Sequence, residues 1–212
     1  MLNAFGLDIE TLENKFRALK NDIKLIFFTQ EAGCPHCKDA RSLFETVASI
    51  THKIAFDSFN FAIDAEKDRE YHIVAVPALA IIGEKDYGIR YYGCPEGMAL
   101  SNFLDDIVYV SRGESALKPD VAIKLARYKK PVQLKIFISH YCPYSLPVAK
   151  LALKLAIASD DIKVDIIHAD EFLELAQKYN VRGLPMTVVN EKKSFYGALD
   201  EEEYVQRIIE LA

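Results

Sequence analysis

The sequence predicts an α/β protein made of two similar units in tandem, each with a mixed central β-sheet flanked by helices. The first supporting observation is a Cys-Pro pair that occurs at Cys34 and again, 108 positions later, at Cys142. The second is that Pro77 and Pro185 repeat at the same offset, so that each proline follows its cysteine by 43 residues. The third is that a similar order of strands and helices surrounds both pairs. Such internal repetition indicates a duplicated structural unit.

The elements of the first unit follow from the spacing of its apolar residues. Steps of three and four residues predict helices, and alternation or short apolar runs predict strands. In chain order these elements are a helix at 9–19, a strand at 24–29, a helix from about 34 to 48, a strand containing Phe59, Phe61 and Ile63, a short helix ending at 71, a strand at 78–82, a turn at 83–86, a return strand at 87–92 and a closing helix at 100–108.

The second unit repeats this order. Its predicted elements are a helix at 120–128, a strand at 133–139, a helix from 143 to about 157, a strand at 163–167, a helix at 171–179, a strand at 186–190, a return strand at 194–196 and a closing helix at 204–209. The polar stretch at 111–120 separates the two series. We therefore expect units at 1–115 and 116–212, each with helices on both faces of its sheet.

Length, composition and charge restrict the possible partners. The 212 residues suit two small units, and 50 % hydrophobic with 27 % charged residues is typical of a packed globular protein. The net charge of −5, with both signs interspersed, argues against a nucleic-acid partner. The longest apolar run, at 73–82, is far shorter than the roughly 20 residues that cross a membrane. Charged residues within the first 20 positions also argue against a secretory signal, so we expect a cytoplasmic protein with no membrane partner.

The residues Cys34, Pro35, His36 and Cys37 lie where a strand leads into a helix. If Cys34 is the N-cap, Pro35 suits the first helical position, because the amide there has no partner in any case. The amides of His36 and Cys37 and the positive end of the helix would then favour a thiolate at Cys34. His36 adds a nearby cation. Cys37, held one turn further in, could resolve a mixed disulfide on Cys34, so the motif predicts thiol–disulfide exchange.

Two other interpretations of this motif stay open, a zinc site and an inert cysteine pair. A closed zinc site needs four ligands, usually from a second closely spaced pair. The other candidate ligands do not have such spacing, and they are His52, His72, Cys94, His140, Cys142 and His168. We therefore predict no metal and no cofactor.

The two recurring prolines form the second part of the candidate site. A proline at the start of a strand removes no donor that the sheet needs. A cis bond before Pro77 or Pro185 would leave backbone groups of Val76 or Leu184 exposed, where an extended peptide of a substrate could pair. An ordinary trans proline is the alternative. The recurrence at 43 residues favours the cis interpretation.

These residues resemble the thioredoxin fold. Two such units over essentially the whole chain resemble the thermophile protein disulfide oxidoreductases, also called glutaredoxin-like proteins. The stretches at 87–97 and 103–107 are similar to the joining region of that family. The resemblance implies an enzyme that makes, reduces or reshuffles protein disulfides, with a cis-proline beside each redox motif. It also implies protein thiols and disulfides as partners, electrons from a flavoprotein reductase and, in some members, transfer to a peroxiredoxin.

The second motif departs from that family. Cys142 to Ser145 resembles a glutaredoxin motif without its second sulfur, whereas the first motif resembles that of strongly oxidising bacterial disulfide oxidases. Ser145 is either natural, which makes the site monothiol, or an engineered change that traps intermediates. In both cases Cys142 can form a mixed disulfide that an outside thiol must release.

Two further positions limit what the resemblance assigns. Phe28 and Ile136 stand where thioredoxin has a buried acid, so no proton acceptor is assigned to Cys37. Cys94 has no motif around it. We interpret it as a small apolar residue at a strand end, with a resolving role as the alternative.

Three functions fit these residues. The leading one is an enzyme in which Cys34 attacks, Cys37 resolves and the second unit adds peptide binding and a monothiol site. The second is an electron-relay partner that serves one dedicated peroxidase. The third is a chaperone-like module in which the backbone beside Pro77 and Pro185 matters more than sulfur.

Overall fold

The computed structural model describes residue 6 and residues 8–212. Its helices are α1 (Ile9–Phe16), α2 (Cys37–Ser49), α3 (Ala65–Tyr71), α4 (Gly97–Arg112), α5 (Pro119–Arg127), α6 (Ser145–Ala158), α7 (Leu173–Lys178) and α8 (Glu201–Leu211). Its strands are β1 (Ile23–Thr29), β2 (Ile54–Asn60), β3 (Ala78–Ile82), β4 (Ile89–Tyr92), β5 (Val132–Ile138), β6 (Ile162–His168), β7 (Met186–Val189) and β8 (Lys193–Tyr196). Among the described residues, no helix is both long and apolar enough to cross a membrane.

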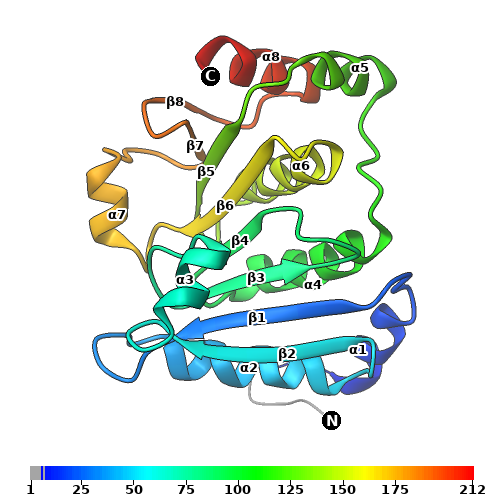
Figure 1. Ribbon diagram of the computed structural model, residues 1–212, viewed down its shortest axis with the longest axis vertical. Coiled ribbons are helices and arrows are strands. Elements are labelled where there is room, and N and C mark those ends of the chain that lie inside the picture. Colours follow the sequence, from blue (N-terminus) through cyan, green and yellow to red (C-terminus); the bar gives the residue numbers. More distant parts are fainter. Residues whose placement is uncertain (1–5, 7) are drawn as a thin grey trace.

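The two halves of the chain share one eight-stranded sheet (Figure 1). Its strand order is β2-β1-β3-β4-β6-β5-β7-β8, so the N-terminal half supplies the first four strands and the C-terminal half the other four. The halves join where β4 pairs in parallel with β6, with Tyr91 opposite Ile166. Within each half, parallel and antiparallel pairs are mixed as predicted.

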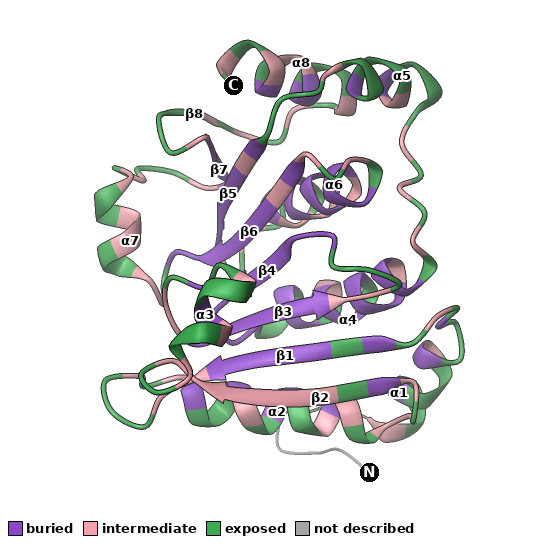
Figure 2. Cartoon of the chain, viewed as in Figure 1, coloured by how far each residue is buried: buried purple, intermediate pink, exposed green. Residues whose placement is uncertain are grey.

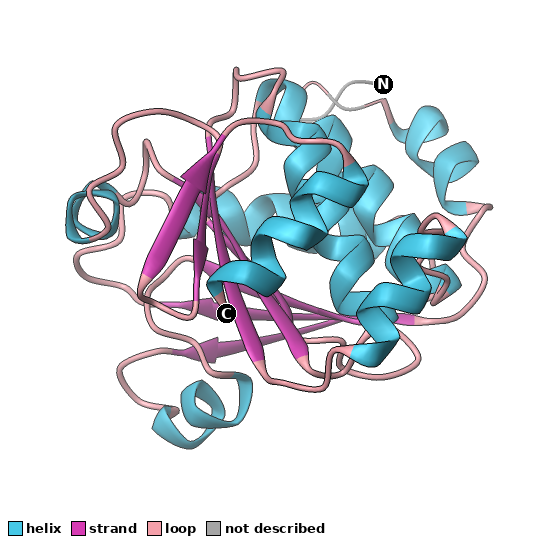
Figure 3. Cartoon of the chain, turned by 90° about the horizontal axis from the view of Figure 1, so that it is seen from above, coloured by secondary structure: helices cyan, strands magenta, loops and turns pink. Residues whose placement is uncertain are grey.

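Helices cover the two faces of the sheet unequally. Helices α2, α4 and α6 pack on one face, and α3 lies on the other (Figures 1 and 3). Alternating residues of β1 enter two separate clusters, because successive side chains of a strand point to opposite faces. Phe27 belongs to the larger cluster under the long helices, whereas Phe28 belongs to a smaller cluster with residues of α3 and α7. Most strands are therefore buried over much of their length, whereas the edge strands β2 and β8 are more exposed (Figure 2).

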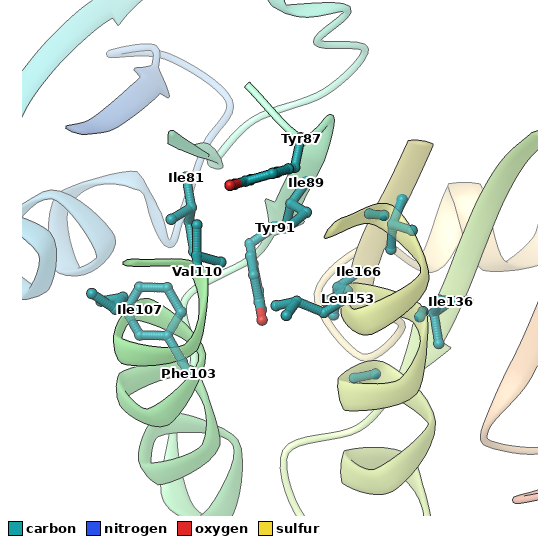
Figure 4. Packing of buried hydrophobic residues seen from close by; sticks show 14 of the residues in the cluster. Ile81, Tyr87, Ile89, Tyr91, Phe103, Ile107, Val110, Ile136, Leu153 and Ile166 are labelled. Atoms are coloured by element: carbon teal, nitrogen blue, oxygen red, sulfur yellow. The ribbon is translucent and has the colours of Figure 1, made fainter. Parts of the chain in front are cut away.

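The larger core runs without interruption from one half into the other. Figure 4 shows Tyr91 of β4 between Phe103 of α4 and Leu153 of α6. The rings of Tyr91 and Phe103 meet edge to face at 5.4 Å. Lys150 of α6 donates to the fully buried carboxylate of Asp106 in α4 at 2.6 Å, and the Tyr91 hydroxyl donates to the same carboxylate. The halves are thus joined by a sheet, a core and a buried ion pair.

Several boundaries differ from the sequence-based prediction by a few residues, and two of these differences lie near the first motif. Strand β2 ends at Asn60, so Phe61 and Ile63 lie in a turn and not in a strand. The Asn60 side chain accepts from the Ala62 amide, and the Asp64 carboxylate accepts from the Asn60 amide, which bends the chain there. The second difference is the start of α2, which lies within the first Cys-Pro motif.

Candidate active site

The first motif holds a disulfide between Cys34 and Cys37 at the end of β1. Their Cα atoms lie 5.4 Å apart. The Cys37 amide donates to the Cys34 carbonyl at 3.3 Å, which closes a turn just before α2. Cys34 is partly exposed, whereas Cys37 is buried at the first position of α2. One sulfur is thus open to a partner and the other is held behind it.

The helix begins later than the sequence predicted. His36, and not Cys34, is the N-cap of α2, and Pro35 precedes the helix in place of occupying its first position. The helix begins late because the Cys37 amide donates to the Cys34 carbonyl and so closes a separate turn. The sequence had predicted that this amide faces the Cys34 sulfur.

Cys34, His36 and the Val76-Pro77 pair line one cavity of about 760 Å³. The peptide bonds before Pro77 and Pro185 are both cis, as predicted. Strand β3 begins only at Ala78, so Val76 lies outside the sheet beside the disulfide. The structure therefore brings together the residues predicted for the first site.

The opposite wall of this cavity comes from the C-terminal half. Phe172, Leu173 and Leu175, at and near α7, line it together with Glu171. Leu173 is 63 % exposed, and Val74 on the other side is 58 % exposed. The exposed apolar side chains near the disulfide therefore come from both halves.

The second motif repeats the backbone of the first. Ser145 donates its amide to the Cys142 carbonyl at 3.0 Å, in the same i to i+3 pattern as Cys37 and Cys34. Cys142 is partly exposed, and its Sγ lies 3.9 Å from the carbonyl oxygen of Leu184, the residue before Pro185. Ser145 is fully buried, and its hydroxyl has no hydrogen-bond partner among the described residues.

A buried carboxylate joins the two motifs. The Glu171 side chain is 6 % exposed, and its Oε2 lies 3.8 Å from Nδ1 of His36. Its Oε1 lies 3.2 Å from Nε2 of His140, two residues before Cys142. The Cys94 amide donates to both carboxylate oxygens, at 2.9 and 3.1 Å.

Next to Glu171, His140 and His168 form a stacked pair. Their ring centroids are 4.1 Å apart with planes at 13°. Burial opposes charge on His140, but the hydrogen bond to Glu171 and the charges of Asp170, Glu171 and Glu96 raise its pKa overall. Burial lowers the pKa of His168 well below its usual value, and His140 lowers it further. The pair thus combines one ring whose pKa is raised with one whose pKa is lowered.

This pair bears on whether a metal could bind. His140, His168 and Asp170 bring possible ligand atoms within 4.8 Å of one another, although their sequence spacing does not predict it. An imidazole ligand holds its metal close to the plane of the ring. Two nearly parallel stacked rings cannot both do so for one ion. We therefore assign no metal to this group in the described part of the chain.

Cys94 lies two residues after the end of β4 and is 3 % exposed. Burial, followed by the charges of Glu171, Glu96 and Asp39, raises the pKa of its thiol to about 12. A thiol that stays protonated is a poor nucleophile. This supports the interpretation of Cys94 as a small apolar residue and argues against a resolving role for it.

A second cavity, of about 390 Å³, lies on the sheet beside α3 and is lined by charged residues. These charges pair with one another. Arg90 binds the Asp86 carboxylate through two nitrogens at 2.6 and 2.9 Å, and Lys135 donates to Asp165 at 2.7 Å. The cavity contains no cysteine, so we interpret it as a satisfied ionic network.

Sequence reasoning missed Glu171, His140 and His168 as members of one site. Glu171 lies 137 positions after Cys34, and nothing in its local sequence points to the first motif. The lack of an acid at Phe28 was the one available signal that a carboxylate comes from elsewhere.

Comparison with known proteins gives matches by sequence and matches by structure. Residues 132–210 match the family model described as a thioredoxin domain. A protein named "Probable Thioredoxin" from Archaeoglobus fulgidus is 35 % identical over 81 residues, which cover 38 % of this chain and 89 % of that protein. The thioredoxin of Methanocaldococcus jannaschii is 32 % identical over 79 residues, covering 37 % of this chain and 87 % of that protein.

Solved structures match over almost the whole chain. A protein disulfide oxidoreductase from Aeropyrum pernix superimposes with a TM-score of 0.85 at 22 % identity, covering 96 % of this chain and 94 % of that one. The alkylhydroperoxide reductase protein AhpF from Enterococcus faecalis superimposes with a TM-score of 0.84 at 18 % identity, covering 96 % of this chain and 97 % of that one. These likenesses extend the fold of two tandem thioredoxin-like units over both halves.

Proposed function

The chain belongs to the thioredoxin family and is a thiol–disulfide oxidoreductase, and we propose that Cys34 and Cys37 exchange with disulfides and thiols of other proteins. The observation that carries this proposal is the paired placement of the two sulfurs. Cys34 opens into the cavity beside Val76, and Cys37 is buried behind it within disulfide distance. An exposed attacking thiol with an adjacent resolving thiol is what exchange through a mixed disulfide requires.

In the reducing direction the reaction has two steps. The Cys34 thiolate attacks a substrate disulfide, forming a mixed disulfide and releasing one substrate thiolate, which takes up a proton. Cys37 then loses its proton and attacks the Cys34 sulfur, which re-forms the internal disulfide and releases the second substrate thiol. The protein dithiol loses two electrons and the substrate disulfide gains them. The reverse sequence oxidises a substrate dithiol.

The halves at 1–115 and 116–212 take different parts in this proposal. The second is a monothiol site, since Ser145 replaces the resolving sulfur. Cys142 would form a mixed disulfide with a protein or a small thiol, and an outside thiol would release it. Val76 and Leu184, each before a cis-proline, would pair with the extended backbone of a substrate.

We further propose a flavoprotein reductase as the electron source and a cytoplasmic site of action. A relay that serves one peroxiredoxin is the alternative, and it uses the same sulfur chemistry. The two are distinguished by whether a peroxiredoxin is turned over faster than a generic disulfide. The chaperone-like alternative predicts that suppression of aggregation survives loss of both Cys34 and Cys142.

Insulin reduction by the full chain tests the central proposal. We expect Cys34→Ser to abolish activity and Cys142→Ser to lower it only in part. Cys94→Ala is the matched control, because this cysteine is buried with a protonated thiol, and we expect it to keep activity. Full activity of Cys34→Ser would refute the proposal.

A further inference from the structure

The first redox motif has no acid at the position where thioredoxin carries one within its own unit, since Phe28 is fully buried there. A buried carboxylate near this motif comes from the other half of the chain. Glu171 lies between β6 and α7 and lines the cavity of Cys34 and His36. We propose that Glu171 is a positioning residue for the first dithiol, acting through His36. This inference rests on the proposed function.

The carboxylate is held rigidly enough for that role. Both of its oxygens accept from the Cys94 amide, and Nε2 of His140 lies 3.2 Å from Oε1. His140 is fixed in turn, because the Glu96 amide donates to its Nδ1 at 3.3 Å. Oε2 is then directed at Nδ1 of His36, at 3.8 Å. A buried anion with such partners is costly to displace.

The consequence for Cys34 follows from charge. The Glu171 carboxylate, 3.8 Å from Nδ1, restrains the otherwise 45 % exposed His36 ring beside Cys34. An imidazolium beside Cys34 favours the thiolate, which is the attacking form. A nucleophile, an adjacent imidazole and a third group that orients the imidazole form a recurrent arrangement in covalent catalysis. Here the third group belongs to the other half.

Other charges surround Glu171, and any pH dependence must include them. The groups that line the cavity or act on the neighbouring Cys94 and His140 are Asp39, Glu96, His140, Asp170, Glu174 and Lys178. Acids outnumber bases in this set. Replacing Glu171 therefore removes one negative charge among several, so its specific effect must be separated from a general change of charge.

The experiment is the alkylation rate of Cys34 in the reduced full chain, followed by peptide mass spectrometry from about pH 5 to pH 8. We expect Glu171→Gln to slow Cys34 alkylation about fivefold near pH 6, the size expected for loss of one partly exposed ionic contact. The rates should converge at higher pH, where the thiolate forms in both proteins. Glu13→Gln removes the same charge from an exposed position of α1, and it should leave the profile unchanged.

A double-mutant cycle separates positioning from a merely structural role. In a His36→Gln background, Glu171→Gln should slow Cys34 by less than about twofold, since its route of action is gone. Glu171→Asp keeps the charge with a shorter side chain and should give an intermediate rate, which also covers the case in which Glu171→Gln folds poorly. An equal effect of Glu171→Gln with and without His36, or no effect with His36 present, would overturn the inference.

The outcome is distinguishable from failure of the proposed function. If Cys34→Ser still reduces insulin, the proposed function fails whatever Glu171 does. If Cys34→Ser is inactive and Glu171→Gln leaves the Cys34 profile unchanged, only the positioning role fails.

Discussion

The two redox motifs of this chain share one backbone turn and differ at their third and fourth residues. Both place a partly exposed cysteine at a turn before a helix, and both face a cis-proline. At the fourth position the first motif has the Cys37 sulfur, joined to Cys34, and the second has the Ser145 hydroxyl, which has no partner among the described residues. The fold therefore provides the position of the second group, and the side chain there decides whether the site can resolve its own mixed disulfide.

Making the first motif resemble the second should give the largest effect. Cys37→Ser leaves Cys34 without a resolving thiol, so a single turnover of the pre-reduced protein, whose own thiols supply the electrons, should release the second substrate thiol at least about a hundredfold more slowly, because the pair acts as a unit. Glutathione should restore part of this release, since it supplies a thiol that attacks the mixed disulfide. Single-turnover insulin reduction with and without glutathione checks this, and an unchanged rate without glutathione would show that Cys37 is not the resolving group.

The buried ion pair between the halves should give the next largest effect. Lys150→Met leaves Asp106 buried without its cation and should lower the free energy of unfolding by about 3 kcal/mol, measured by urea denaturation. Lys154→Met on the same helix is the control. Its contact with Glu201 is longer, at 3.8 Å, and should be worth less than about 1 kcal/mol. If both variants lost the same free energy of unfolding, the ion pair of Lys150 with Asp106 would contribute no more than a surface contact.

Converting the second motif into the first should also have a measurable effect. Ser145→Cys should allow the second half to close a disulfide with Cys142, seen as a loss of two hydrogen atoms in the intact mass. In the reduced state it should also stabilise the chain by roughly 1 kcal/mol, since an unpaired buried hydroxyl is removed. If Cys142 and the new cysteine stay reduced under conditions that oxidise the first pair, the two turns are not equivalent.

The stacked histidines should give a smaller, pH-dependent effect. The folded-state pKa of His168 is depressed, so the unfolded chain binds more protons and stability falls as the pH drops below about 6.5. His140 has a raised pKa, and its contribution has the opposite sign, present at low pH and lost as the pH rises through the folded value. Urea denaturation at about pH 5 and pH 7 should show a loss on acidification of roughly 1 kcal/mol. His168→Phe should remove or reverse it, and an unchanged loss would assign the effect to other groups.

Much of the fold was predictable from local pattern. The order of strands and helices, the repeat and both cis-prolines follow from periodicity and from the fixed offset between motifs. Errors arose where a single side chain decides a boundary, as Asn60 does by ending β2.

Long-range pairing was not predictable. The parallel contact of β4 with β6 depends on two strands from different halves, each of which also fits an independent sheet. Glu171 was missed for the same reason, because its relation to His36 exists only after the halves join. The cysteines were found because their chemistry is encoded in adjacent residues, and the prolines because each follows its cysteine at the same offset.

The proposed chemistry depends most on Cys34 being the sulfur that attacks. Mixing Cys37→Ser with a disulfide-containing protein and locating the trapped mixed disulfide by peptide mass spectrometry tests this directly. We predict that the substrate is attached to Cys34, alone or together with a smaller amount on Cys142. Attachment to Cys94, or to Cys142 with Cys34 left free, would contradict it.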